Sequence, residues 1–293
     1  MGEAARNDPR PRARGTERAR RRARSAALND LAAAALLGLV QGLTEFLPVS
    51  STAHLILVSD ALGLDPAKFG LSFDVALHLG TALAVLIYFA RTWLSLARDL
   101  LGGRPRLPLL VIAGTIPAGA AGVLLEGAVS TTLRSPWWIV AGLVGGSIVF
   151  AAAERVATQR RSAGDLTLGD ALLMGAAQAI ALLPGVSRSG ITISSGLVRG
   201  LAREEATRFS FLLATPVILG AGLKTLLDAR KAQALFDAPD LLAVGFAVSF
   251  VTGMAAVAFL IRFLRVHSLG WFVGYRLALA LVIVVLLLAG RPL

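Results

Sequence analysis

The amino-acid sequence predicts an all-α polytopic integral membrane protein, and three observations predict it. The 293-residue chain is 56% hydrophobic and only 16% charged, with a mean hydropathy of +0.72, whereas soluble domains usually carry about 25% charged residues. Its apolar residues gather in long runs, and those at 107–125 and 241–261 contain neither Asp nor Glu. A run of about 18 apolar residues is long enough to cross a bilayer. The 30 Gly and 12 Pro fit the same class, because membrane helices tolerate both residues better than soluble helices do.

The first 27 residues differ from the rest of the chain. They hold nine Arg against three acidic residues, which gives this segment +6 of the formal net charge of +11. An Arg- and Ala-rich segment of this kind predicts a disordered tail, and its charge favours contact with anionic lipid headgroups. No aromatic residues lie between its Arg residues, so we expect no nucleic-acid partner. Residues 28–293 are predicted to form a single membrane domain.

Composition also limits the chemistry. The chain contains no Cys and three His, so disulfides and thiolate-bound metals are excluded and a His-rich zinc site is not indicated. It contains neither a Walker A pattern nor the Gly-rich fingerprint of dinucleotide-binding folds, which argues against ATP and NAD.

Two segments repeat each other at a distance of 136 residues. Residues 38–51 read GLVQGLTEFLPVSS and residues 175–189 read GAAQAIALLPGVSRS, so that Pro48 corresponds to Pro184. At the same spacing, Ser51 is expected to correspond to Ser187. Paired apolar segments that are interrupted by Pro or Gly at matching positions indicate a site at the interface of two repeats. The repeat halves are predicted at about 30–125 and 168–261.

Each repeated segment is predicted to be a helix, a break and a second helix, at about 30–61 and 168–199. Proline removes a backbone donor and stops the preceding helix, and the hydroxyl residues after it can cap a new one. We expect both units to be re-entrant, because non-helical backbone is tolerated at membrane depth where protein or water surrounds it. Six plainer apolar segments are predicted to span the membrane: 71–90, 107–125, 137–154, 209–227, 241–261 and 271–290.

Loop charges predict the topology. The net charges are +3 at 91–106, +2 at 155–166 and +2 at 262–270, against 0 at 126–136 and −1 at 228–240. Because basic loops face the cytoplasm, the equivalent loops 91–106 and 228–240 fall on opposite sides and the repeat is inverted. Both termini would then lie outside, against the usual bias for an Arg-rich tail. A first unit that crosses the membrane, a tail that breaks the rule and a true start downstream of Met1 all remain open.

Polar residues cluster at both breaks. The first cluster is Gln41, Glu45, Ser50, Ser51, Thr52 and His54, and the second contains Ser187, Arg188, Ser189 and Thr192. Gln41 and Glu45 share a helix face, because they are four residues apart. Hydroxyl groups and one Arg at the start of a helix predict an anion site, and the guanidinium fork suits phosphate.

Together the clusters predict phosphoryl- or acyl-transfer chemistry. Ser51 is the candidate nucleophile, Glu45 or His54 the candidate base, and Arg188 the candidate phosphate clamp. The other polar residues of the two clusters are candidate substrate-binding groups. Two purely structural interpretations are alternatives. Glu45 and Arg188 could form a buried ion pair that only stabilises the fold, and the hydroxyl groups could only bond a neighbouring turn or helix.

Three further polar residues have no assigned role. Asp74 and His78 are four residues apart, and they either line the same cavity or sit near the membrane edge. Arg276 is expected to snorkel or to pair locally.

Three stretches resemble one known family. They are QGLTEFLPVSSTAHL at 41–55, PGVSRSGITIS at 184–194 and FSFLLATP at 209–216, and the sequence is similar in these to the undecaprenyl-diphosphate phosphatase family, also called the bacitracin-resistance family. The resemblance covers about 30–290. It implies six spans with two re-entrant helix pairs in an inverted repeat, in the bacterial plasma membrane.

The resemblance also implies an activity, which is hydrolysis of the C55 isoprenoid diphosphate to the monophosphate carrier of cell-wall synthesis. The active site would face the periplasm, and a divalent cation, Mg²⁺ or Ca²⁺, would support turnover with Glu45 as its ligand. By position, the family's catalytic residues correspond to Glu45, Ser51, His54 and Arg188. Gln41 stands where the family often has Glu, which leaves Glu45 as the one carboxylate of this motif.

A second function remains an alternative. Inverted repeats with broken helices are common in secondary transporters, so a transporter or a lipid-phosphate flippase would fit the same fold. A nucleophile beside a base favours hydrolysis. The sequence leaves the lipid chain length and the oligomeric state open.

Overall fold

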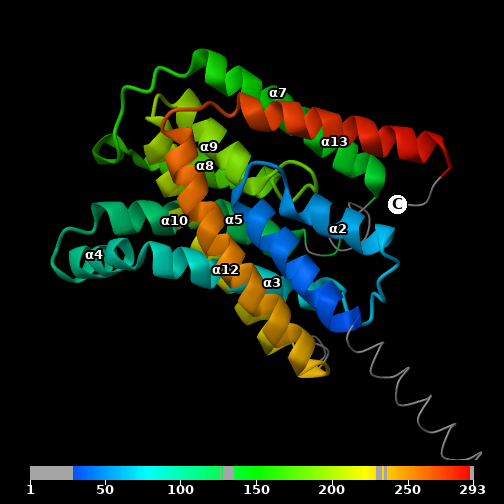
Figure 1. Cartoon of the computed structure of the whole chain (residues 1–293). Coiled ribbons are helices and arrows are strands. Elements are labelled where there is room, and N and C mark those ends of the chain that lie inside the picture. Colours follow the sequence, from blue (N-terminus) through cyan, green and yellow to red (C-terminus); the bar gives the residue numbers. More distant parts are fainter. Residues whose placement is uncertain (1–28, 126, 128–134, 229–232, 234–235, 291–293) are drawn as a thin grey trace, which may run out of the picture.

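The computed structural model describes residues 29–125, 127, 135–228, 233 and 236–290. These residues form helices joined by turns and short loops (Figure 1), and no β-strand occurs among them. One isolated bridge pairs Arg161 with Leu201. The tail predicted at residues 1–27 lies outside the described part of the chain.

Six of the helices are long and apolar enough to cross a membrane, with 18 to 26 residues each. They are α3 (Leu71–Tyr88), α5 (Arg106–Leu124), α7 (Pro136–Val156), α10 (Arg203–Leu227), α12 (Pro239–Leu264) and α13 (Gly270–Leu288). Each coincides with one of the six segments predicted from hydropathy. The predicted class, an all-α polytopic membrane protein, is confirmed.

The two predicted breaks are also present. A helix over 29–46 ends before Pro48 and continues as α2 (Ser51–Ala61), while α8 (Leu168–Ile180) ends before Pro184 and continues as α9 (Arg188–Val198). The helices α2 and α9 have 11 residues each. Such short helices do not fit a full crossing of the hydrocarbon core, which requires about 20 residues.

The structure corrects the register of the repeat by one residue. The residues before α2 and α9 are Ser50, with φ 77°, and Ser187, with φ 72°. Positive φ is uncommon for residues other than glycine, so the shared conformation identifies Ser50, and not Ser51, as the counterpart of Ser187. Ser51 then corresponds to Arg188. The shift arises because the second break contains an extra residue, Gly185, whose φ of 93° favours glycine.

Residues 90–101 form a helix that the loop-charge argument treated as part of a loop. This helix, α4 (Ala90–Leu101), buries Leu96 and exposes Leu94 and Leu101. Its sequence mixes Arg with apolar residues, so a hydropathy scan for spans passes over it.

Glycine contacts bring the two halves together. Helix 29–46 packs on α12, where a Cβ at Gly38 would lie 2.6 Å from the carbonyl oxygen of Gly245, and α8 packs on α5, where a Cβ at Gly175 would lie 2.1 Å from that of Gly114. Small residues allow this close approach between membrane helices. Each broken unit therefore packs on a spanning helix of the other half, and the two breaks meet near the middle of the bundle (Figure 1).

Candidate active site

The two breaks are hydrogen-bonded to each other. The backbone N–H of Gly185 donates to Ser50 Oγ at 3.1 Å, and Ser189 Oγ donates to the carbonyl oxygen of Leu47 at 3.2 Å. One bond runs from each break to the other, so the starts of α2 and α9 are held side by side.

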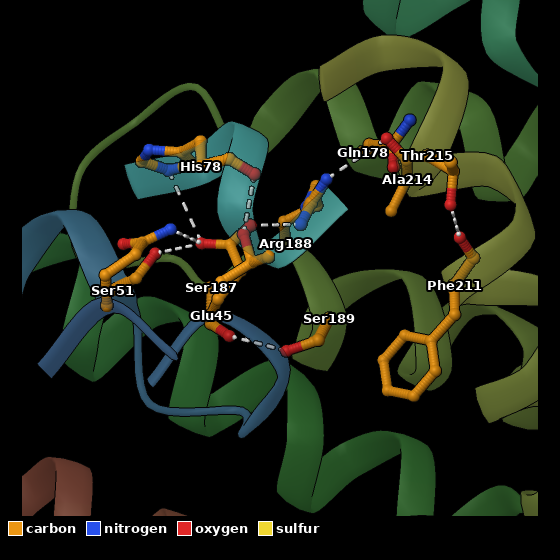
Figure 2. Close-up of polar contacts among 12 residues, drawn as sticks. Glu45, Ser51, His78, Gln178, Ser187, Arg188, Ser189, Phe211, Ala214 and Thr215 are labelled. Atoms are coloured by element: carbon orange, nitrogen blue, oxygen red, sulfur yellow. Dashed lines mark hydrogen bonds and ion pairs between the residues drawn. The ribbon is translucent and has the colours of Figure 1, made fainter. Parts of the chain in front are cut away.

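Glu45 lies at the centre of this junction and is only 6% exposed. Its Oε2 accepts hydrogen bonds from Ser51 Oγ at 2.5 Å and from Gln41 Nε2 at 3.0 Å. Its Oε1 is paired with the guanidinium of Arg188. His78 Nε2 lies 3.4 Å from Oε2 (Figure 2). A buried carboxylate requires such partners, because burial of an unpaired charge is costly.

Ser51 and Arg188 occupy the first positions of their helices. The first N–H groups of a helix have no partner within it, and the helix dipole adds partial positive charge there. Two helix starts and one guanidinium therefore surround Glu45. This arrangement can receive a phosphate group.

The side chain of Arg188 spans the space between the junction and α10. Its Nη1 donates to the carbonyl oxygen of Ala214 at 3.3 Å, while Nη2 binds Glu45 (Figure 2). Ser187 Oγ accepts from the N–H of Gly190 at 3.4 Å and caps α9. The contacts of Nη1 and Nη2 together fix the orientation of the Arg188 guanidinium.

A cavity of about 240 Å³ opens at this junction. Its polar lining contains six of the ten predicted site residues: Glu45, Ser50, Ser51, Thr52, Ser187 and Arg188. Its apolar lining includes Val75, Val217, Ile218 and Ala221. Gln41 is fully buried next to Glu45 and donates a hydrogen bond to it, and it is not among the residues that line the cavity.

The other three predicted residues are not among those that line the cavity. Ser189 bonds the first break, as described above, and Thr192 is fully buried and bonds Ser210 of α10. His54 Nδ1 bonds the carbonyl oxygen of Ser50 at 2.7 Å, and its Nε2 bonds Tyr275 Oη at 2.6 Å. The rings of His54 and Tyr275 are stacked, with centroids 5.7 Å apart. The geometry therefore connects His54 to the backbone before Ser51.

His78 is the site residue that sequence reasoning left undecided. It lines the cavity beside Glu45, and its Nδ1 bonds the carbonyl oxygen of Asp74 at 2.7 Å. Since a carbonyl oxygen only accepts, Nδ1 carries the proton in this arrangement and Nε2 faces the carboxylate. The spacing of four residues was the available signal, and it could not distinguish the cavity from the membrane edge. No pattern in the sequence indicated that Tyr275 belongs near the site.

Two oxygen donors are available for a divalent cation. No group of three or more His, Cys, Asp or Glu side chains in the described ranges is placed to hold a metal. Gln41 Oε1, however, is buried without a hydrogen-bond partner in the described structure and belongs to the same side chain that binds Glu45. Magnesium is often held by one or two carboxylates together with substrate phosphates, and Glu45 is the carboxylate that lines this cavity. The residues present fit a cation that is shared with a substrate.

Comparison with known proteins identifies the family. A family described as "Bacitracin resistance protein BacA" matches residues 34–282. The chain is 47% identical over 269 residues to the undecaprenyl-diphosphatase of Rubrobacter xylanophilus, which covers 88% of this chain and 99% of the relative. It is 43% identical over 265 residues to that of Corynebacterium diphtheriae (87% and 93%) and 44% identical over 266 residues to that of Mycolicibacterium smegmatis (87% and 96%).

The fold and the junction define a polytopic membrane protein with a buried Ser–Glu–Arg site. The chain belongs to the BacA family of bacitracin-resistance proteins. This confirms the resemblance found at the two motifs.

Proposed function

We propose that this protein hydrolyses undecaprenyl diphosphate to undecaprenyl phosphate and inorganic phosphate. The observation that carries the proposal is the hydrogen bond of 2.5 Å between Ser51 Oγ and Glu45 Oε2, beside the guanidinium of Arg188. A hydroxyl bonded to a carboxylate, with a planar cation adjacent, is an arrangement that suits phosphoryl transfer through a serine. The names of the relatives support the same substrate.

Arg188 would first exchange its partner. In the substrate complex its guanidinium would bind two oxygens of the terminal phosphate, which releases Glu45 Oε1 from the ion pair. Glu45 would then gain basicity at the moment when Ser51 must lose its proton. Substrate binding and activation of the nucleophile are thereby coupled through one carboxylate.

The chemical step would proceed in two displacements. Ser51 Oγ attacks the terminal phosphorus and its proton passes to Glu45, while the bond from that phosphorus to the bridging oxygen breaks and undecaprenyl phosphate leaves. Glu45 gives this proton to the departing bridging oxygen and is ionised again. Water then attacks the phosphoserine and gives a proton to Glu45. The Oγ–phosphorus bond breaks, Ser51 Oγ regains a proton, and phosphate is released. Arg188 and the N–H groups at the two helix starts would stabilise the charge on the transferred group.

Glu45 serves as the base in this mechanism, because it holds the hydroxyl of Ser51 directly. His54 would support the mechanism from behind, by holding the carbonyl oxygen of Ser50. Ser50, Thr52 and Ser187 line the cavity and would bind the diphosphate, while Ser189 and Thr192 would hold α9 in place. A divalent cation would be held by Glu45, Gln41 Oε1 and the diphosphate, and it would neutralise charge on the substrate.

The apolar side of the cavity supports a lipid substrate. Val75, Val217 and Ala221 line both the polar cavity and an adjoining groove of about 570 Å³. The groove is otherwise mostly apolar, with Val123 and Leu182 among its lining residues. An isoprenoid chain that left the diphosphate would enter it without crossing a polar surface.

We further propose the membrane arrangement that the loop charges favour. Both helix–break–helix units would be re-entrant, and the repeat would be inverted. By the family resemblance, the site would open to the periplasmic or outer face of the bacterial plasma membrane. Recycling of the lipid carrier there would serve cell-wall synthesis and account for bacitracin resistance.

The test is phosphate release from C55 diphosphate by the purified protein in detergent, with and without a chelator. We expect phosphate release without the chelator and a much lower rate with it. Addition of excess Mg²⁺ or Ca²⁺ should restore the rate. The same protein in liposomes distinguishes the alternative function. Translocation of lipid without phosphate release would reject the hydrolase in favour of a flippase.

A further inference from the structure

Arg276 of α13 is buried at the junction of the two breaks. Arg276 has 0% of its surface exposed. Its Nη1 donates to the carbonyl oxygen of Pro48 at 3.4 Å, and its Nη2 donates to that of Gly185 at 2.8 Å. One guanidinium therefore contacts the backbone of both breaks. Of the two expectations for Arg276, snorkelling to the surface is wrong, and its partners lie on other elements of the chain.

The remaining contacts fix the guanidinium against α7. Its Nε donates to Ser147 Oγ at 3.0 Å, and Nη2 also lies 3.0 Å from the carbonyl oxygens of Gly142 and Leu143. Its Cζ lies 4.6 Å from the ring centre of Phe150, a cation–π contact. All of these described partners are uncharged. A charge in a membrane interior is costly, so the contacts to both breaks indicate a function for it.

The two carbonyl groups that Arg276 binds belong to interrupted backbone. Pro48 precedes Ser51 by three residues, and Gly185 precedes Arg188 by three residues. Helical hydrogen bonding has stopped at both positions, so these carbonyl groups need partners from elsewhere. Arg276 thus binds the carbonyl group three residues before the nucleophile and the carbonyl group three residues before the phosphate clamp.

We infer that Arg276 is a positioning residue that sets the placement of Ser51 relative to Arg188; this inference rests on the proposed hydrolase function. Ser51 must attack the phosphorus that Arg188 holds, and these two residues come from different halves of the chain. A guanidinium suits this task because its planar donors are rigid, whereas a lysine ammonium is a single point on a flexible stem. Arg276 touches neither substrate oxygens nor the reacting atoms in this scheme.

The adjacent glycines of α7 provide a matched pair of test variants. A Cβ at Gly146 would lie 2.3 Å from Arg276 Nη2 and 2.8 Å from the carbonyl oxygen of Val186. A Cβ at Gly145 would have nothing within 4 Å. Gly146→Ala therefore displaces the guanidinium or the second break, while Gly145→Ala makes the same chemical change on the same helix without contact.

The kinetic test compares Arg276→Lys and Gly146→Ala with Gly145→Ala and wild type. We expect the first two variants to lose kcat by about 100-fold, the loss that a misplacement of about 1 Å produces, with KM changed by less than about threefold because Arg188 still binds phosphate. Gly145→Ala should match wild type. Free guanidinium should restore part of the rate of Arg276→Ala. Equal activity of Gly146→Ala and Gly145→Ala, or a loss confined to KM, would overturn the inference.

A second measurement is independent of catalysis. The chain has no cysteine, so Ala61→Cys and Val198→Cys place spin labels only at the exposed ends of α2 and α9. Pulsed electron paramagnetic resonance should give one narrow distance distribution in this background and a broader or shifted one when Arg276→Lys or Gly146→Ala is added. An unchanged distribution in both variants would overturn the positioning role. Absence of phosphate release from wild type would instead reject the proposed function, and the distance measurement would still decide whether Arg276 joins the breaks.

Discussion

Ser51 and Arg188 are each the first residue of an eleven-residue helix, and their side chains bind opposite oxygens of the Glu45 carboxylate. The repeat thus supplies two equivalent helix starts, which differ in the residue placed there. A hydroxyl stands at one and a guanidinium at the other. This difference between equivalent positions would turn a symmetric pair of broken helices into an asymmetric site with a nucleophile and a clamp.

The Ser51→Ala variant should lose phosphate release by about 1,000-fold or more, because it removes the hydroxyl that Glu45 holds for attack. Its melting temperature should remain within a few degrees of wild type, since the change removes one hydroxyl. Ser195→Ala is the matched control, because Ser195 Oγ bonds only within α9, to the carbonyl oxygen of Thr192 at 2.8 Å. Comparable losses in the two variants would contradict the role of Ser51.

Glu45→Gln should lower kcat by about 100-fold or more, because an amide can accept the hydrogen bond of Ser51 but cannot take its proton. Gln41→Ala should cost about tenfold and raise the concentration of Mg²⁺ or Ca²⁺ needed for half-maximal rate, since it removes one of two proposed oxygen ligands. The measurement is phosphate release against cation concentration. An unchanged cation requirement in Gln41→Ala would remove Gln41 from the cation site.

Arg188→Lys should raise KM and lower kcat/KM by about 30-fold, which corresponds to about 2 kcal/mol of lost transition-state stabilisation. The ammonium keeps the charge and loses the two parallel donors. Arg262→Lys makes the same change at an exposed position outside the site and should leave both constants unchanged. Wild-type kinetics in a folded Arg188→Lys protein would refute the clamp.

His54 and Tyr275 should behave as one unit. Tyr275→Phe removes the hydroxyl that bonds His54 Nε2 at 2.6 Å, and we expect a loss in kcat of about fivefold, because the backbone of Ser50 is then held less firmly. In His54→Ala the same change should have little further effect. A double-mutant cycle measures this coupling. Fully additive losses would show that Tyr275 does not act through His54.

Asp170 should control stability and leave chemistry unchanged. Burial raises the pKa of this carboxyl, but hydrogen bonds from Arg161, Arg199 and Thr167 outweigh burial and hold the pKa well below its usual value. Since the pKa is lowered in the folded state, the stabilisation is present above about pH 4 and is lost as the pH falls below the unfolded value. Asp170→Asn should lower the free energy of unfolding by about 2 kcal/mol, which is the scale of a hydrogen bond to a charged group. It should keep the wild-type kcat per folded molecule, as measured by thermal unfolding and phosphate release on one sample.

The sequence predicted those features that depend on local pattern. The six spans follow from uninterrupted apolar runs, and both breaks follow from Pro48 and Pro184, because proline stops a helix wherever it occurs within one. The sequence predicted the ion pair of Glu45 with Arg188 as a structural alternative to catalysis. Both residues line the cavity, so the same ion pair is compatible with a structural role and with a catalytic one.

Features that depend on long-range contacts were not predicted. The register of the repeat was wrong by one residue, since equal spacing does not show that Gly185 is an inserted residue. Tyr275 and Arg276 lie more than 200 residues from His54 and Pro48 in the chain. In the sequence they are two polar residues near the start of a predicted span. Their contacts with His54 and with the two breaks depend on the packing of α13 beside the breaks.

Direct detection of a phosphoenzyme tests the central claim, that Ser51 is the nucleophile of a diphosphate hydrolase. The purified protein is mixed with C55 diphosphate labelled in its terminal phosphate, quenched in acid during turnover, and mapped by peptide mass spectrometry. We expect the label on the peptide that contains Ser51, its loss in Ser51→Ala, and its accumulation in a variant whose second step is slowed. Turnover with no label on the protein, or with the label on another residue, would contradict the account.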